Sequence, residues 1–187
     1  YRARRQRQMC IRDSNNAAVA AQHLRDRGLR KVAVLDVDFH HGNGTQAIFY
    51  NRSDVLFLSL HGDPMHAFPH FLGHADEIGN GEGEGFNFNY PMPAGTSFAE
   101  WNSSLVSAID QIAKFGADAV VISLGVDTFE RDPISFFKLT SPDFIKVGAS
   151  IASLNLPTLF VMEGGYAVEE VGINTVNVLM GFKEKET

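Results

Sequence analysis

The chain has 187 residues with 16 basic and 22 acidic side chains, which gives a net charge of −6. This length suffices for one domain with a core, and 44% hydrophobic with 20% charged residues is typical of a globular protein. No apolar stretch is long enough to span a bilayer, and the acidic charge argues against nucleic acid as a partner.

The first fourteen residues differ from the rest because they hold five arginines, one aspartate and little that is apolar. Residues 4–14 read Arg-Arg-Gln-Arg-Gln-Met-Cys-Ile-Arg-Asp-Ser, which resembles an in-frame translation of a transposon adapter used to prepare sequencing libraries. We interpret residues 1–14 as a non-native tail and exclude them from reasoning about the fold. Without them the chain has 11 basic and 21 acidic residues, a net charge of −10 and no cysteine, as expected of a protein in the reducing cytoplasm.

Apolar spacing and turn residues predict alternating helices and strands after this tail. In chain order, the expected elements are helix 15–28, strand 32–36, helix 42–50, strand 55–60, strand 86–90, helix 98–115, strand 119–124, helix 142–154, strand 158–162 and helix 168–182. The boundary signals are Gly28 and Gly116 as helix stops, Ser97 and Ser141 as N-caps, and Pro91 as the end of a strand. This alternation predicts a three-layer α/β domain, with a parallel sheet flanked by helices.

A long segment rich in glycine, residues 61–85, separates the second and third predicted strands. Its run from Gly79 to Gly85 lacks the Gly-Lys-Ser/Thr of a phosphate-binding loop, and Glu82 and Glu84 would repel phosphate. We predict a flexible surface loop, and loops of this length inside a compact domain are often functional.

Charged and imidazole side chains appear abruptly where predicted strands end. Asp36, Asp38 and His40 alternate, so all three point to one side if the strand continues extended. Asp127 follows the strand 119–124 and is placed to join Asp38 and His40 at the carboxyl edge of the sheet, where sites of such folds lie. Three protein ligands with an open fourth position are typical of catalytic zinc, although this ligand set also suits Fe(II), Mn or Co. The alternative for Asp38 and His40 alone is a capped turn.

Three stretches, in order, resemble the motifs of the histone deacetylase superfamily. Residues 36–46 (Asp-Val-Asp-Phe-His-His-Gly-Asn-Gly-Thr-Gln) resemble its metal motif, residues 123–128 with Asp132-Pro133 its second metal motif, and residues 163–166 (Glu-Gly-Gly-Tyr) its catalytic tyrosine motif. Residues 68–77 and 132–140 are similar to the bacterial acetylpolyamine amidohydrolase branch. The resemblance implies an arginase/deacetylase-like fold, of which residues 15–187 form the C-terminal part of a single domain.

The resemblance also implies a zinc-dependent deacetylase that hydrolyses the acetyl amide of acetylpolyamines or of acetyl-lysine. Zinc would be bound by Asp38, His40 and Asp127, while Tyr166 would stabilise the oxyanion and Asp36 would orient a histidine. Family members bind structural K⁺ or Na⁺, which here implies two sites, one of Asp36, Asp38, His40, Ser59 and Leu60, the other of Phe49, Arg52, Val55 and Phe86. The implied substrate tunnel includes Phe68, Phe71, Gly164 and Gly165. A homodimer is compatible with the family.

The chain departs from the family pattern at the general base. The family has two adjacent histidines upstream of the metal strand, whereas His23 is the only histidine before His40 in this chain. Asn43 stands where many family members have aspartate. We therefore expect the 187-residue chain to bind metal but to deacetylate poorly or not at all. Two other classes stay open, a non-catalytic module that binds acetylated cations and a manganese ureohydrolase, which typically has Asp-x-His-x-Asp rather than Asp-x-Asp-x-His.

Overall fold

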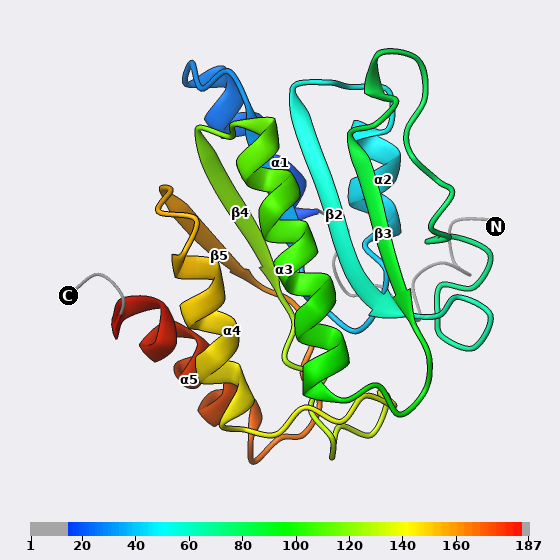
Figure 1. The fold of residues 1–187 in the computed structure, drawn as a ribbon, viewed down its shortest axis with the longest axis vertical. Helices are drawn as coiled ribbons and strands as arrows, with labels where there is room; N and C mark the ends of the chain where they lie inside the picture. The colour runs from blue at the N-terminus through cyan, green and yellow to red at the C-terminus, as the bar shows by residue number, and fades with distance from the viewer. Residues whose placement is uncertain (1–14, 185–187) are drawn as a thin grey trace, which may run out of the picture.

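The computed structural model describes residues 15–184, so the proposed non-native tail at residues 1–14 lies outside the described residues. Helices and strands alternate along most of this range (Figure 1). The helices are α1 (Asn16–Asp26), α2 (Asn43–Phe49), α3 (Phe98–Phe115), α4 (Asp143–Ala152) and α5 (Val171–Glu184), with a 3-10 turn, η3, at Gly81–Gly83. The strands are β1 (Val32–Asp36), β2 (Val55–Gly62), β3 (Asn87–Met92), β4 (Ala119–Leu124) and β5 (Thr158–Met162).

The five strands form one sheet in the order β3-β2-β1-β4-β5, and each neighbouring pair is parallel. β1 is central, and Asp36 at its end is aligned with Ser59 of β2 and with Ser123 of β4. Because parallel strands end at the same edge, the residues that follow β1 and β4 emerge side by side. The structure confirms the predicted three-layer α/β fold with a parallel sheet.

Helices cover both faces of the sheet (Figure 1). On one face, α1 and α2 pack over a cluster that includes Val32 and Val34 of β1. On the other face, α3 and α4 pack over a larger core that includes Ala33 and Leu35 of the same strand. Successive β1 residues thus alternate between the two clusters, as the pleat requires, and this explains why the strand reads as a continuous apolar run.

The two C-terminal helices, α4 and α5, lie in close contact. A Cβ added at Gly148 of α4 would lie 1.9 Å from the carbonyl oxygen of Val178, and one at Gly181 of α5 would lie 1.9 Å from that of Ile145. Any larger residue at either glycine would force the two backbones apart. α5 also contacts β5, where the rings of Phe160 and Phe182 are 5.2 Å apart between centroids.

The boundary signals at the two ends of α3 are confirmed, and α1 begins at a cap that the sequence analysis had counted as part of the helix. The Asn15 side chain accepts a hydrogen bond of 2.8 Å from the N–H of Ala18 at the start of α1. Ser97 caps α3, and the Glu100 side chain returns a bond to the Ser97 N–H, which makes a capping box. Gly116 ends α3 in the left-handed conformation, with φ of 69°.

Other predicted boundaries are wrong. Pro91 does not end the third strand, because β3 continues to Met92 at the edge of the sheet, where a residue without an N–H is tolerated. β2 runs two residues further than predicted, to Gly62. The N-cap of α4 is Pro142 rather than Ser141. The Asp143 carboxylate accepts a hydrogen bond of 2.9 Å from the N–H of Thr140, just before the helix.

The last helix, α5, begins at Val171 rather than at residue 168. Among residues 15–184, no helix combines the length and the apolar character needed to cross a membrane.

Candidate metal centre

Three side chains with metal-binding atoms converge at the carboxyl edge of the sheet. Asp38 and His40 follow β1, and Asp127 follows β4. One ligand atom from each lies within 4.8 Å of the other two. His40 Nδ1 is 3.1 Å from Asp38 Oδ1 and 3.1 Å from Asp127 Oδ2. The structure therefore brings together the three residues predicted from the sequence.

The segment that follows β1 reaches this arrangement by turning rather than by continuing as a strand. β1 ends at Asp36, whose carboxylate accepts the N–H of Asp38 at 3.1 Å. The Asp38 carboxylate in turn accepts the N–H of His40 at 2.8 Å. Bonds from a side chain to the backbone two residues later are turn-forming. The strand thus does not continue extended beyond Asp36, although the ligands meet.

Asp127, which follows β4, is held by the turn that follows β1. It is fully buried, and its Oδ1 accepts the N–H of Phe39 at 2.8 Å. Its Oδ2 faces His40 at 3.1 Å, so one carboxylate both fixes the turn after β1 and contributes a ligand atom. Since a buried carboxylate needs partners, these two contacts account for its position.

Burial and mutual charge shift the pKa values of the three groups. Burial opposes protonation of His40, but the hydrogen bonds that Asp127 and Asp38 accept from its ring outweigh burial and raise its pKa to about 10. Burial and the charge of Asp38 raise the pKa of Asp127 to about 7. Burial would also raise the pKa of Asp38, but the hydrogen bond from His40 outweighs it, so this pKa is lowered. The two carboxylates thus share a strong preference for a nearby positive charge.

The donor set fits a divalent cation. Two carboxylates and one imidazole are ligands of zinc and of several transition metals. Glycines leave the room that these ligands need: a Cβ at Gly125 would lie 2.3 Å from Asp38 Oδ2, and one at Gly164 would lie 2.5 Å from the same atom and 2.6 Å from Asp127 Oδ2. A cation held by all three residues would meet the demand for positive charge that the proton on His40 meets otherwise.

The segment after β5, residues 163–167, approaches this cluster through its backbone. The N–H of Gly164 donates to Asp38 Oδ2 at 2.8 Å. Tyr166 is 50% exposed, and its N–H donates to Asp132 Oδ2 at 2.7 Å. Sequence analysis placed Asp132 in a motif without giving it a role, because a single aspartate before proline carries no signal of what it will contact.

Of the two predicted tunnel phenylalanines, one lies near the cluster. The ring of Phe68 is 6.4 Å from that of His40 between centroids. Phe71 is 89% exposed, and its ring contacts that of His70. A tunnel role for both, and for Gly164 and Gly165, stays a prediction.

The residues expected to bind K⁺ or Na⁺ lie in two parts of the fold, one at the ends of β1 and β2 and one around the start of β2. Asp36 is buried and is aligned with Ser59, whose hydroxyl is 2.9 Å from His61 Nδ1, and Leu60 follows. Burial, followed by the charge of Asp38, raises the pKa of Asp36 well above its usual range. The second group lies around the end of α2 and the start of β2 and comprises Phe49, Arg52, Val55 and Phe86. Cation binding by either group, and the orientation of a histidine by Asp36, stay predictions.

A buried polar network joins the loop 63–85 to α2 and β3, and sequence analysis missed it. Its centre is Gln46, whose Oε1 is within 3.1 Å of donor nitrogens on three side chains, those of His41, Asn87 and Asn89. Gln46 Nε2 donates to the Glu77 carboxylate, which accepts the N–H of Gly73 at 3.0 Å. The alternation of Asn87 and Asn89 along one strand was the available signal. The network fixes the loop against the sheet edge, so the loop is anchored rather than purely a surface feature.

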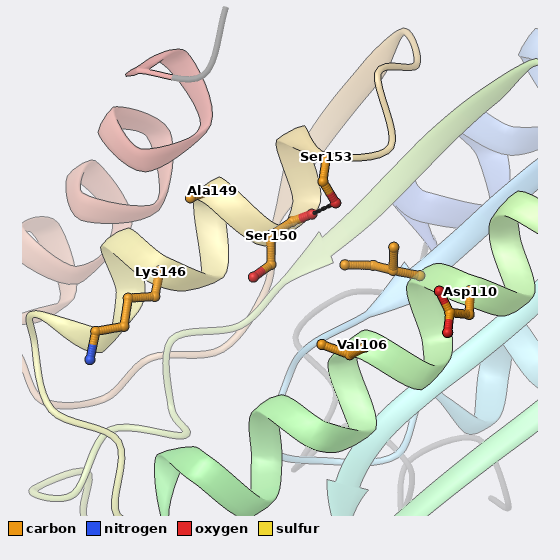
Figure 2. Close-up of a pocket in the computed structure, with 7 residues that line it drawn as sticks. Val106, Asp110, Lys146, Ala149, Ser150 and Ser153 are labelled. Atoms are coloured by element: carbon orange, nitrogen blue, oxygen red, sulfur yellow. Dashed lines mark hydrogen bonds between the residues drawn. The ribbon is translucent and has the colours of Figure 1, made fainter.

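A hollow on the surface lies elsewhere, between α3 and α4 (Figure 2). Its lining mixes apolar and polar side chains, from Val106, Ile109, Asp110, Lys146, Ala149, Ser150 and Ser153. None of the three candidate ligands lines it, so the metal cluster and this hollow are separate features.

Comparison with known proteins supports the assignment of the three motifs to the histone deacetylase family. Residues 6–181 match the histone deacetylase domain. The chain is 64% identical over 167 residues to the acetylpolyamine amidohydrolase of Mycoplana ramosa. The aligned region covers 89% of this chain and 49% of that relative. It is 63% identical over 169 residues to acetylpolyamine amidohydrolase 2 of Pseudomonas aeruginosa, with 90% and 49% covered.

Solved structures of the same family have a fold similar to that of this chain. The crystal structure of acetylpolyamine aminohydrolase from Burkholderia pseudomallei matches with a TM-score of 0.88 and 47% identity, over 90% of this chain and 49% of that one. An HDAC homolog from Aquifex aeolicus matches with a TM-score of 0.83 and 30% identity, over 90% and 45%. The chain spans about half the length of the curated relatives that it matches.

Proposed function

The chain belongs to the histone deacetylase family, and from that premise we propose that the protein it represents is a metal-dependent amidohydrolase acting on acetylated amines. The observation that carries the proposal is the convergence of Asp38, His40 and Asp127, whose ligand atoms lie within 4.8 Å of one another. An imidazole between two buried carboxylates at the ends of adjacent parallel strands is costly to assemble. A bound catalytic cation would offset that cost, because it would neutralise the charge of the two buried carboxylates.

These three residues would hold zinc, or another divalent ion such as Fe²⁺, which when bound polarises the amide carbonyl and makes a water more acidic. The protein's own part is to keep the ligands in place. Asp36 holds the N–H of Asp38, and Gly164 donates its N–H to the same carboxylate, so Asp38 is fixed from two elements. Such support of a ligand by outer contacts commonly changes metal affinity by 10- to 100-fold, roughly.

Tyr166 would donate its hydroxyl proton in a hydrogen bond to the oxyanion that forms at the scissile carbonyl. Half of the surface of Tyr166 is exposed, which is consistent with a residue that meets a substrate. Asp36 would hold the imidazole of a histidine as a base, in the manner that carboxylates orient imidazoles in other hydrolases. Its burial at 4% exposure supports a partner that is also buried.

An acetylated polyamine is the substrate that the relatives favour, because two similar proteins carry the name acetylpolyamine amidohydrolase. The negative charge of the chain is compatible with a cationic substrate. Phe68, whose ring lies 6.4 Å from His40, would offer an apolar wall for the methylene chain of such a substrate. Acetyl-lysine shares both the methylenes and the amide, and is the second candidate.

Hydrolysis of N-acetylputrescine and of a fluorogenic acetyl-lysine peptide by the zinc-loaded full-length gene product tests the proposal. We expect amine release that requires the metal, is lost in Asp127→Ala and favours the polyamine. Asp143→Asn, in a carboxylate outside the cluster, is the matched control. Metal-independent turnover, or full activity in Asp127→Ala, would contradict the proposal.

The 187-residue chain tested alone should bind zinc yet turn over slowly. It carries no adjacent histidine pair before His40, and loss of general-base catalysis costs on the order of 10²–10⁴-fold in rate. Turnover near that of the full-length protein would refute this expectation. If the full-length protein binds acetylated amines without hydrolysing them, a non-catalytic binding module becomes the better description.

A further inference from the structure

The tyrosine loop, residues 163–167, crosses between two carboxylates that come from different strand ends. The N–H of Gly164 donates to Asp38 Oδ2 at 2.8 Å. The N–H groups of Tyr166 and Ala167 donate to Asp132 Oδ2 at 2.7 and 3.2 Å. Asp132 is 5% exposed, so its carboxylate is almost wholly removed from water and depends on these donors.

Asp132 is itself fixed on the loop that follows β4. Its Oδ1 accepts the N–H of Ile134 at 3.1 Å, which is a turn-forming bond two residues along the chain. The neighbouring Arg131 makes an ion pair of 2.5 Å with Glu170, just beyond the tyrosine loop. One oxygen of Asp132 therefore anchors the carboxylate to its own loop, and the other reaches across to the tyrosine loop.

Gly164 and Gly165 have no side chains that could fix the middle of the tyrosine loop. A Cβ at Gly164 would collide with the ligand carboxylates, as described above. Gly165 has φ of +150°, and a Cβ there would lie 2.7 Å from Val126 Cγ2 and 2.8 Å from Val171 Cγ2. Both positions therefore require glycine. At these glycines only backbone groups can hold the loop. The Gly164 carbonyl accepts the N–H of Val126 at 2.9 Å, and the loop N–H groups donate to carboxylates, which form stronger hydrogen bonds than neutral acceptors do.

We propose that Asp132 is a positioning residue, which sets the backbone of Tyr166 and thereby places its hydroxyl against the substrate carbonyl. The inference rests on the proposed function for the role of Tyr166, but the contacts of Asp132 do not. Because the Asp132 bonds are made to Tyr166 itself and to the residue after it, a change at Asp132 moves the phenol directly. Asp132 does not touch the substrate, so it acts through Tyr166.

Asp132→Asn in the zinc-loaded full-length gene product tests the proposal. The amide keeps the size of the carboxylate but has one oxygen, so it cannot accept from both Ile134 and Tyr166. We expect the Tyr166 and Ala167 amides to exchange with deuterium about tenfold faster or more. We expect kcat to fall about 10- to 100-fold, with KM changed less than about threefold, as for a misplaced catalytic group.

The matched control is Asp143→Asn. Asp143 is 8% exposed and accepts the N–H of Thr140 at 2.9 Å, so it loses a comparable bond at the start of α4. It should leave exchange at residues 166 and 167 and the kinetic constants unchanged. Equal effects of the two variants on kcat would mean general destabilisation and would overturn the proposal.

A double-mutant cycle with Tyr166→Phe separates positioning from a merely structural role. If Asp132 acts through Tyr166, then adding Asp132→Asn to Tyr166→Phe costs less than about twofold more in kcat. Multiplicative losses would overturn the proposal. So would unchanged exchange at Tyr166 and Ala167 in Asp132→Asn.

Two further outcomes keep the test decisive. If Asp132→Asn does not fold, exchange in the unsubstituted protein decides, because unprotected amides at Tyr166 and Ala167 would overturn the proposal. If the unsubstituted protein hydrolyses no acetyl amide, the proposed function fails and the catalytic consequence fails with it. The exchange experiment then still shows whether Asp132 fixes the loop.

Discussion

The centre of the sheet and its β5 flank are held in place by different means. Every residue of β1, β2 and β4 is buried, whereas no residue of β5 is. Leu35 in β1 is 0% exposed, and Leu159 in β5 is 46% exposed. Apolar packing on both faces therefore fixes the strand ends that carry the metal ligands. The tyrosine loop after β5 is held instead by hydrogen bonds, which include those of its N–H groups to Asp38 and Asp132 and the backbone bond from the Val126 N–H to the Gly164 carbonyl.

This difference assigns separate supports to the two parts of the site. Hydrophobic burial is strong and non-directional, so it stabilises β1 and β4 without specifying the orientation of a single group. Charge-assisted hydrogen bonds are directional, so they can set the backbone of a short loop even where packing is incomplete. The ligand cluster should accordingly respond to core mutations, and the tyrosine loop to changes in its carboxylate partners.

The largest effect should come from truncating a leucine at the centre of the sheet. Leu35→Ala should lower the free energy of unfolding by about 2–5 kcal/mol, the range for fully buried leucines. The matched change Leu159→Ala should cost about 0.5 kcal/mol, as for exposed positions. Urea unfolding of both variants measures the difference. Equal costs for the two variants would contradict the difference in burial between β1 and β5, since they would mean that the β5 flank is covered in solution.

A buried histidine on β2 should make the stability of the central region depend on pH. Burial, followed by the charge of His41, lowers the pKa of His61 from 6.5 to about 4. Between these two pKa values the unfolded chain binds a proton at His61 that the folded chain does not bind. The contribution of neutral His61 to stability is therefore fully present above about pH 6.5 and is lost as the pH falls towards 4. The free energy of unfolding should decrease by about 2 kcal/mol between pH 7 and pH 5.

His61→Gln isolates that contribution. The variant cannot titrate at this position, so its unfolding free energy should change less between pH 7 and pH 5 than that of the unsubstituted chain. The same substitution at His23, on the exposed surface of α1, is the matched control. An identical pH dependence with and without His61 would show that its ring is hydrated. It would then contradict the burial of β2 away from solvent.

The sequence predicted much of this arrangement because apolar runs, helix caps and strand-end carboxylates are local signals. β4 and β5 match their predicted ranges, and Asp38, His40 and Asp127 converge as expected. What sequence patterns missed are contacts between distant segments. The bonds of Asp132 to the tyrosine loop span 34 and 35 residues, and those of Gln46 to Asn87 and Asn89 span 41 and 43. No periodicity encodes such pairs.

Truncating the centre of the buried network should have an intermediate effect. Gln46→Ala removes one acceptor from each of Asn87 and Asn89, whose amide nitrogens keep the carbonyls of Glu77 and His74 as their other acceptors. Buried unsatisfied N–H groups cost about 1–3 kcal/mol. The substitution also frees the Glu77 carboxylate, so the Gly73 amide should exchange faster. Gln111→Ala, on a half-buried position of α3, is the matched control in urea unfolding and exchange. A loss confined to stability, with Gly73 still protected, would mean that Gln46 does not anchor the loop.

The smallest effect should come from the ion pairs at the edge of the sheet away from the metal ligands. The hydrogen bond from Arg52, assisted by Arg25 and opposed by burial, lowers the pKa of Asp54 to about 2. A depressed carboxylate stabilises the fold above about pH 4, and this contribution is lost as the pH falls towards 2. Asp54 is 28% exposed, however, so water and salt compete with both arginines. Asp54→Asn should therefore cost less than about 1 kcal/mol at pH 7, and less still in 1 M NaCl. A loss above 2 kcal/mol that persists in salt would show that these charges are sealed from solvent as β1 is, and the contrast between a packed centre and a solvated periphery would not extend to this edge.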